Sequence, residues 1–252
     1  MRRRPTAWIA AFAATATAAL LTGTASPAQA ITSGGTPDGD AHPYVGALWY
    51  GDRSDWLCTG SLISPTVFVT AAHCTVGLTD VFVSFESDIT DPSTATLLPG
   101  KAYTHPQFLA GPYAADVGVV VLDKRVKTTA LGLLPALGAA ESQLGQPVTS
   151  VGYGSLEQSR VPHEPKFAGY GLRSYAVGTL QHANGTWLFQ SQNAAKGDEG
   201  TCYGDSGGPN LQYGTDVILA VTSTGDGPCY ATGRNQRLDT DLAQSFIRPF
   251  LG

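Results

Sequence analysis

The sequence has few basic residues, and it lacks long apolar runs outside its first 30 residues. Lys and Arg number 15 against 20 Asp and Glu, which gives a formal net charge of −5 at pH 7. Because an acidic chain has little attraction for phosphate backbones or anionic lipid surfaces, we expect neither nucleic acid nor a membrane as a partner. Internal repeats and low-complexity segments are also absent after residue 30. What remains is a chain of 252 residues, enough for one large domain or two small packed ones.

Cysteine is also scarce: the chain has four, and no two of them form a Cys-x-x-Cys pair. A structural zinc site normally needs thiolate pairs at such close spacing, so the sequence disfavours one. Glu86, Asp88 and Asp91 form a small acidic cluster, but without the repeated ligand pattern of a calcium loop they are better explained as a solvated loop. We therefore expect no metal and no other cofactor. In an exported chain, four cysteines favour two disulfides, with three possible pairings.

The N-terminus has the organisation of a secretory signal peptide. Three arginines follow Met1, a mostly apolar, Ala-rich stretch continues to about Leu21, and residues 28–30 (Ala-Gln-Ala) match the small-x-small cleavage rule. A membrane anchor is the alternative, but threonines interrupt the apolar stretch. Removing residues 1–30 leaves 12 basic residues against 20 acidic ones, a net charge of −8. We expect residues 1–30 to be removed and the mature protein to be secreted to the extracellular space.

Turn-forming residues separate many short runs that are rich in β-branched and aromatic residues. Such regular spacing, without a strong helical period, predicts an all-β sandwich or barrel. The expected strands are 45–50, 61–63, 67–70, 81–85, 117–122, 148–153, 173–179, 187–190, 211–213 and 217–222. Residues from about 123 to 135 are expected to connect the five strands before them to the five strands after them. One helix is expected near residues 240–247, capped by Thr240 or Asp239.

A serine stands at the centre of the small, turn-forming run 204–209 (Gly-Asp-Ser-Gly-Gly-Pro). A serine hydroxyl becomes a useful nucleophile only beside a base that a third group orients. The pattern Gly-x-Ser-x-Gly also fits the nucleophile elbow of α/β-hydrolases, but there the histidine follows the serine, and all five histidines here precede Ser206. The order His73, Asp116, Ser206 is instead the order found in chymotrypsin.

Three stretches carry a resemblance to a known family: residues 70–74 (Thr-Ala-Ala-His-Cys), 116–122 (Asp-Val-Gly-Val-Val-Val-Leu) and 204–209. They resemble the signature stretches of the trypsin/chymotrypsin-like serine peptidases, most closely the secreted bacterial branch, and the similarity runs from Ile31 to the C-terminus. The resemblance implies an all-β fold of two six-stranded antiparallel β-barrels with a C-terminal helix. Residues 31–130 would form the N-terminal barrel and residues 131–252 the C-terminal barrel, with the active site in the cleft between them.

The resemblance also assigns roles in a secreted serine endopeptidase that works through an acyl-enzyme intermediate. Ser206 is the expected nucleophile, His73 its general base, and Asp116 the carboxylate that orients the imidazole. The backbone N–H groups of Gly204 and Ser206 are expected to form the oxyanion hole. His105, in a Thr-His-Pro run, is expected to be structural. Two rival carboxylates lie in predicted turns and are expected to be solvated: Asp80 and Asp123.

Two further features follow from the resemblance alone. The implied disulfides are Cys58 with Cys74 and Cys202 with Cys229. Asp205 is expected to pair with the α-amine of Ile31 and so to order the oxyanion loop, since a buried charge without a partner is very costly. Because the signal peptide ends directly before Ile31, we expect signal peptidase itself to create this terminus, without a pro-segment. Thr32 and Ser33 depart from the Ile-Val-Gly-Gly start of the family.

By register with the family, Gly200 lies at the floor of the primary specificity pocket. The absence of charge there argues against strong selection for Arg or Lys and allows an apolar or aromatic substrate side chain. Nearby Asp198, Glu199 and Asp226 are the counter-argument, because they could attract a cation. Thr224 stands where the family has an apolar tryptophan wall. The expected substrate-binding residues are Gly200, Thr201, Ser223, Gly225 and Asn235.

The partners implied are protein or peptide substrates and proteinaceous inhibitors, and a monomer is expected. Two other functions stay open. A catalytically silent homologue that binds proteins would share this fold, although silent relatives usually lose a triad residue. An esterase would use the same serine.

Overall fold

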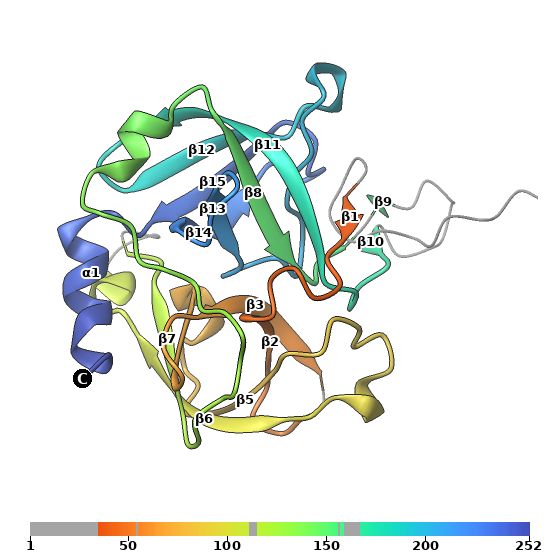
Figure 1. Cartoon of the computed structure of the whole chain (residues 1–252), viewed down its shortest axis with the longest axis vertical. Helices are drawn as coiled ribbons and strands as arrows, with labels where there is room; N and C mark the ends of the chain where they lie inside the picture. The colour runs from red at the N-terminus through yellow and green to blue at the C-terminus, as the bar shows by residue number, and fades with distance from the viewer. Residues whose placement is uncertain (1–34, 54, 111–114, 156, 159–166) are drawn as a thin grey trace, which may run out of the picture.

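The computed structural model describes residues 35–53, 55–110, 115–155, 157–158 and 167–252. The signal peptide expected at 1–30, and Ile31, lie outside these ranges. Two β-barrels, one above the other in Figure 1, make up most of the described chain. The prediction of an all-β fold of two six-stranded antiparallel barrels with a C-terminal helix is confirmed.

In the first barrel, six antiparallel strands close in the order β2-β3-β4-β7-β6-β5, because β5 pairs back with β2. Their bounds are β2 Val45–Trp49, β3 Trp56–Leu62, β4 Val67–Thr70, β5 Asp80–Ser84, β6 Leu98–Thr104 and β7 Gly118–Leu122. The sequence analysis misses β6, whose run Leu-Pro-Gly-Lys-Ala-Tyr-Thr lacks a regular apolar alternation. It forms nevertheless, because β5 and β7 supply hydrogen-bond partners on both sides.

In the second barrel, the order is β8-β11-β12-β15-β14-β13, and β13 closes the ring by pairing with β8. Their bounds are β8 Pro147–Gly152, β11 Ser174–Ala183, β12 Trp187–Ser191, β13 Pro209–Gln212, β14 Ile218–Gly225 and β15 Thr232–Arg237. Two-residue strands complete the set: β1 Thr36–Pro37 pairs with β11, and β9 Glu157–Gln158 pairs with β10 Phe167–Ala168. The sequence analysis also misses β15, because its run Thr-Gly-Arg-Asn-Gln-Arg is polar throughout.

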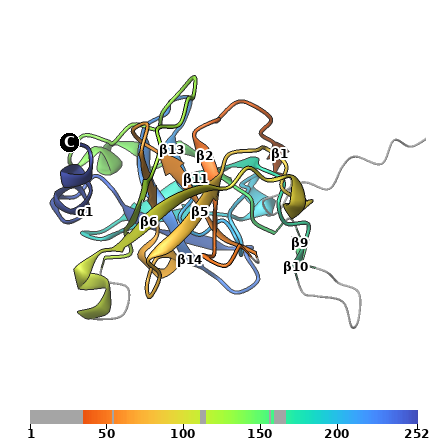
Figure 2. The same ribbon diagram turned by 90° about the horizontal axis from the view of Figure 1, so that it is seen from below.

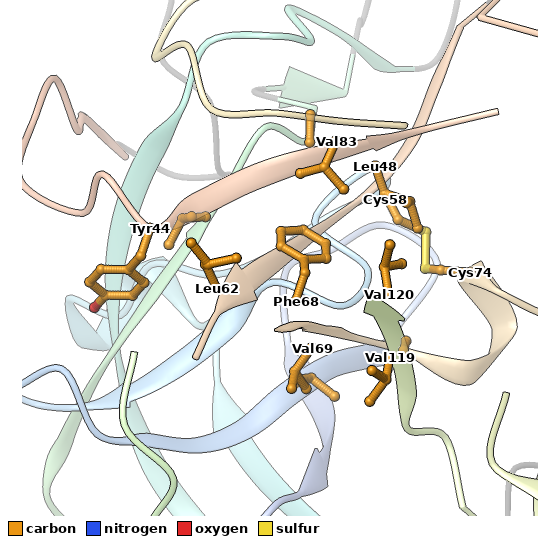
Figure 3. Packing of buried hydrophobic residues seen from close by; sticks show 14 of the residues in the cluster. Tyr44, Leu48, Cys58, Leu62, Phe68, Val69, Cys74, Val83, Val119 and Val120 are labelled. Carbon is orange, nitrogen blue, oxygen red and sulfur yellow. A yellow bond between two sulfur atoms is a disulfide. The ribbon is translucent and has the colours of Figure 1, made fainter. Parts of the chain in front are cut away.

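The core of the first barrel is a packed aliphatic and aromatic interior, shown in Figure 3. Phe68 of β4 is fully buried at its centre, and Gly60 of β3 makes room for it: a Cβ at residue 60 would lie 2.3 Å from the Phe68 ring. Removing a buried phenylalanine side chain from such a core typically costs about 3–5 kcal/mol of stability. This rigid interior fixes the strand ends that carry the site described below.

A buried arginine joins the two barrels. Arg173, which directly precedes β11, is 1% exposed and donates to the Asp38 carboxylate at 2.9 Å. Its guanidinium also donates to the carbonyls of Val45 in β2 and Phe85 after β5, both at 3.0 Å. Because a buried guanidinium must be fully hydrogen-bonded, this cluster fixes how the barrels meet.

The C-terminal helix α1, Asp241–Ile247, is capped by Thr240, whose hydroxyl accepts from the N–H of Ala243 at 3.3 Å. Figure 2 shows α1 at the opposite end of the molecule from β9 and β10. Phe246 packs its ring against His105, which anchors the helix to the first barrel. In the described part of the chain, no helix has the length and apolar character needed to cross a bilayer.

Candidate active site

His73 and Asp116 are brought together by the pairing of two strands. His73 lies in the 3₁₀ turn η1, Ala72–Cys74, just after β4, and Asp116 lies two residues before β7. β4 and β7 pair antiparallel with Thr70, the last residue of β4, opposite Gly118, the first residue of β7. The segment after β4 and the segment before β7 therefore lie side by side. The Asp116 carboxylate accepts from His73 Nδ1 at 2.9 Å and from the His73 backbone N–H at 2.9 Å.

The Asp116 carboxylate is fully buried and held by three donors. Two of them are the backbone N–H and Nδ1 of His73, and the third is the Ser223 hydroxyl at 2.5 Å. The backbone N–H of Asp116 in turn donates to the Gln236 side-chain oxygen at 2.9 Å. Burial alone would raise the pKa of Asp116, but the hydrogen bonds from His73 and Ser223 and the charge of His73 outweigh it and lower the pKa. The carboxylate is therefore ionised at neutral pH, as a group that orients an imidazole should be.

Ser206 lies in the loop between β12 and β13, and its backbone is attached to the first barrel. The N–H of Thr59 donates to the Ser206 carbonyl at 2.8 Å, and the sulfur of Cys74 lies 3.7 Å from the same oxygen. The next residue, Gly207, has φ of 80°, and a Cβ there would lie 2.0 Å from the Thr70 hydroxyl. The loop that carries Ser206 is therefore packed directly against the end of β4 and the turn that carries His73.

No hydrogen bond between the Ser206 hydroxyl and His73 occurs among those of the described residues. In free enzymes such bonds are often long and become short only when substrate is bound. The structure thus pairs His73 with Asp116 and places the backbone of Ser206 beside their turn.

The N–H groups of Gly204 and Ser206 have no acceptor within the described ranges, whereas those of the neighbouring Asp205 and Gly207 donate to backbone carbonyls. Gly204 has φ of 97°, a conformation that favours glycine. A Cβ there would also lie 2.9 Å from the ring of Trp56. Two unpaired donors on either side of one residue are the arrangement that an oxyanion hole needs.

The side chain of Asp205, the residue before Ser206, is fully buried. Its carboxylate accepts from the N–H groups of Cys202 and Gly154, both at 2.8 Å, and burial raises its pKa to about 7. Gly152 and Gly154 make room for it, because a Cβ at either position would lie within 2.5 Å of the carboxylate oxygens. The expected partner, Ile31, lies outside the described residues.

A cavity of about 130 Å³ opens beside Ser206. Its lining residues are Thr201, Cys202, Tyr203, Ser206, Thr222, Ser223, Thr224, Gly225, Asp226 and Cys229. Of the expected substrate-binding residues, Thr201, Ser223 and Gly225 line it, while Gly200 and Asn235 do not. The Asn235 side chain is fully buried and donates to Gln190 at 3.4 Å instead.

The three acidic residues near this cavity are placed differently. Asp198 accepts from the Thr179 hydroxyl at 2.7 Å, and Glu199 accepts from the Val177 N–H at 3.0 Å, so both contact β11. Asp226 does line the cavity, but its carboxylate accepts from three consecutive backbone N–H groups, those of residues 230–232. Burial would raise the pKa of Asp226, and these hydrogen bonds together lower it.

A second hollow, of about 350 Å³, lies on the Gly204 side of the loop and is lined by Asp55, Trp56, Tyr170 and Gly204. The rings of Trp56 and Tyr170 meet edge to face at 6.0 Å. The sequence analysis does not find this hollow, because an isolated tryptophan and tyrosine carry no motif.

Both expected disulfides, Cys58–Cys74 and Cys202–Cys229, are present. Cys58, His73 and Cys74 are the one group of metal-ligand side chains that gathers among the described residues, and its sulfurs are joined in a disulfide. In the acidic cluster, Asp88 and Asp91 accept from Thr90 and Ser93 of their own loop. These carboxylates therefore act as turn-stabilising groups.

Comparisons with known proteins agree with this geometry. The Trypsin family model matches residues 31–240. The chain is 29% identical over 201 residues to a trypsin of Saccharopolyspora erythraea, covering 77% of this chain and 85% of that protein. It is also 29% identical over 192 residues to brachyurin of Leptuca pugilator, covering 73% and 81%.

Among solved structures, the HL collagenase structure superposes with a TM-score of 0.66 at 20% identity, covering 84% of this chain and 96% of that one. At this identity the likeness concerns the fold. With the family match over most of its length, the chain belongs to the trypsin family of serine endopeptidases.

Proposed function

We propose that Ser206, His73 and Asp116 form the catalytic triad of a secreted endopeptidase that hydrolyses peptide bonds through an acyl-enzyme. The observation that carries this proposal is the buried, ionised Asp116 bonded to Nδ1 of a partly exposed His73, at the turn against which the Ser206 loop packs. The unpaired N–H groups of Gly204 and Ser206 support it.

In the proposed mechanism, Asp116 holds the proton of His73 on Nδ1 and leaves the lone pair of Nε2 free. Nε2 removes the Ser206 proton while Oγ bonds to the substrate carbonyl carbon. The carbonyl oxygen becomes an oxyanion that the N–H groups of Gly204 and Ser206 stabilise. The imidazolium then donates its proton to the departing amine as the C–N bond breaks. A water, deprotonated by the same nitrogen, hydrolyses the acyl-enzyme.

The expected pairing of Asp205 with the α-amine of Ile31 is part of the proposal. A carboxylate that is fully buried and accepts only backbone N–H groups among the described residues has an environment that an ammonium would complete. We propose that signal peptidase, cleaving after Ala30, creates this amine and that the mature protein is extracellular. N-terminal sequencing of active, secreted protein tests this, and a start at any other residue contradicts it.

The proposed substrates are proteins or peptides, bound by a monomer whose cleft also accepts proteinaceous inhibitors. The test is turnover of casein by the purified protein, beside the Ser206→Ala variant. Casein cleavage that the variant lacks supports an endopeptidase. Turnover of short acyl esters without casein cleavage indicates the esterase, and binding without any turnover indicates the silent homologue.

A further inference from the structure

One buried side chain lies behind the cavity beside Ser206 and has no role in the mechanism above. Gln192 directly follows β12 and is 1% exposed. A Cβ at Gly200 would lie 2.2 Å from its Cγ, and a Cβ at Gly233 would lie 2.5 Å from its Oε1. The Gln192 amide therefore occupies the space that side chains at Gly200 and Gly233 would otherwise enter.

Gln192 is also clamped to the cavity wall through Thr201. Its Nε2 donates to the Thr201 carbonyl at 3.0 Å. Its Oε1 accepts from the Thr201 N–H at 3.3 Å and from the Thr201 hydroxyl at 3.2 Å. Since Thr201 lines the cavity and Gln192 lies behind it, the cavity ends at an uncharged layer that is already hydrogen-bonded.

The small volume of the cavity agrees with a floor filled by Gln192. The cavity volume of about 130 Å³ is smaller than the roughly 150 Å³ of an engineered cavity that binds benzene, so it does not fully accommodate a phenylalanine ring. A side chain of the size of valine or leucine fills such a space. The long side chains of arginine and lysine would have to place a charge against an amide that offers no acceptor to spare.

Resting on the proposed function, we propose that Gln192 is a specificity-determining residue: it fills the floor of the primary pocket and restricts cleavage to sites after uncharged side chains of small to medium size. The position differs from Gly200, which the sequence places at the floor and whose missing side chain makes room for Gln192. Asp226, the one charged residue among the described residues that line the cavity, does not substitute for a floor charge, because three backbone donors hold its carboxylate in its own loop.

Two variants test the proposal on a peptide library that differs only in the residue before the cleaved bond. Gln192→Ala joins the vacated space to the cavity, so kcat/KM for phenylalanine relative to valine should rise about tenfold or more, since each methylene of fit is worth 10-fold to 200-fold. Gln192→Glu keeps the shape but buries a carboxylate facing the Thr201 carbonyl, so kcat/KM for lysine and arginine relative to leucine should rise about tenfold or more.

Gln190→Ala is the matched control. Gln190 lies two residues earlier in β12, is equally buried, and faces Ser150 and Asn235 rather than the cavity. Its library profile should match that of the wild type, and active-site titration with a fluorophosphonate normalises each variant for folded enzyme. Should Gln192→Ala fail to fold, the isosteric Gln192→Glu decides the question.

The outcomes separate the two proposals. Wild-type cleavage after arginine, lysine or tryptophan, or library profiles that Gln192→Ala and Gln192→Glu leave unchanged, overturns the role of Gln192 and leaves the endopeptidase function intact. Failure of the wild type to cleave any peptide or casein overturns the proposed function, and the role of Gln192 with it.

Discussion

Removing or blocking the α-amine of residue 31 should change the pH dependence of protein stability by an amount that can be calculated. The reason is that Asp205 is buried without a cationic side chain among its described contacts. Burial raises the pKa of Asp205 from 3.8 to about 7. The folded chain then binds this proton more tightly than the unfolded chain. The protonated Asp205 therefore makes its full contribution to the free energy of unfolding below pH 3.8, and this contribution is lost as the pH rises towards 7. This rise in the pKa of Asp205, from 3.8 to about 7, corresponds to a loss of about 4 kcal/mol in the free energy of unfolding.

An ammonium beside Asp205 should remove this loss. We therefore compare a chain that begins at Ile31 with a chain that begins at Ala30, and with the Ile31 chain acetylated at its amine. At pH 4 the three should be similarly stable. At pH 7.5 the free Ile31 chain should be more stable than the other two, by an amount approaching the same 4 kcal/mol, and it alone should be fully active.

Urea unfolding followed by tryptophan fluorescence, from pH 4 to pH 8 with both disulfides intact, measures the three stabilities. The acetylated chain separates the loss of charge from the added length. If the three chains lose or gain stability in parallel across this range, Asp205 has no partner at the N-terminus and the reasoning is refuted.

Other predictions follow from single contacts. Asp116→Asn should lower kcat about 10⁴-fold in pH-rate measurements with the fold intact, the loss known for a template triad enzyme, and a loss below tenfold would exclude Asp116 as the orienting group. Ser223→Ala removes one of the hydrogen bonds that lower the pKa of Asp116, so that pKa should rise, as NMR titration of the labelled Asp116 carboxyl would measure, and an unchanged pKa contradicts this. Gly154→Ala drives a Cβ to 2.5 Å from the Asp205 carboxylate and should destabilise by about 1–3 kcal/mol in urea unfolding, whereas Gly185→Ala, with open space around it, should be neutral.

The strands that can be predicted from the sequence are those in which apolar residues alternate with polar ones or form a continuous run. β4 and β12 alternate or concentrate apolar residues, and they form within one residue of the expected bounds. β6 and β15 lack such a pattern and form because neighbouring strands on both sides supply their hydrogen bonds. Tertiary pairing of this kind overrides local propensity and is invisible in a short window.

The same distinction holds in the site. Motifs point to His73, Asp116 and Ser206, but nothing in the local sequence marks Gln192, because its proposed role comes from the two glycines, at 200 and 233, between which it packs. The glycines themselves are in the sequence. What occupies the space they leave depends on how β12 and β15 pair in three dimensions.

The central claim is that His73 activates Ser206. Mass spectrometry after reaction with a fluorophosphonate tests it most directly, with the wild type beside His73→Ala. The account predicts one added group, on the peptide that contains Ser206, and a labelling rate that falls at least a hundredfold in His73→Ala, in line with the usual contribution of general-base catalysis. Labelling at another residue, or equal labelling of Ser206 in both proteins, would contradict it.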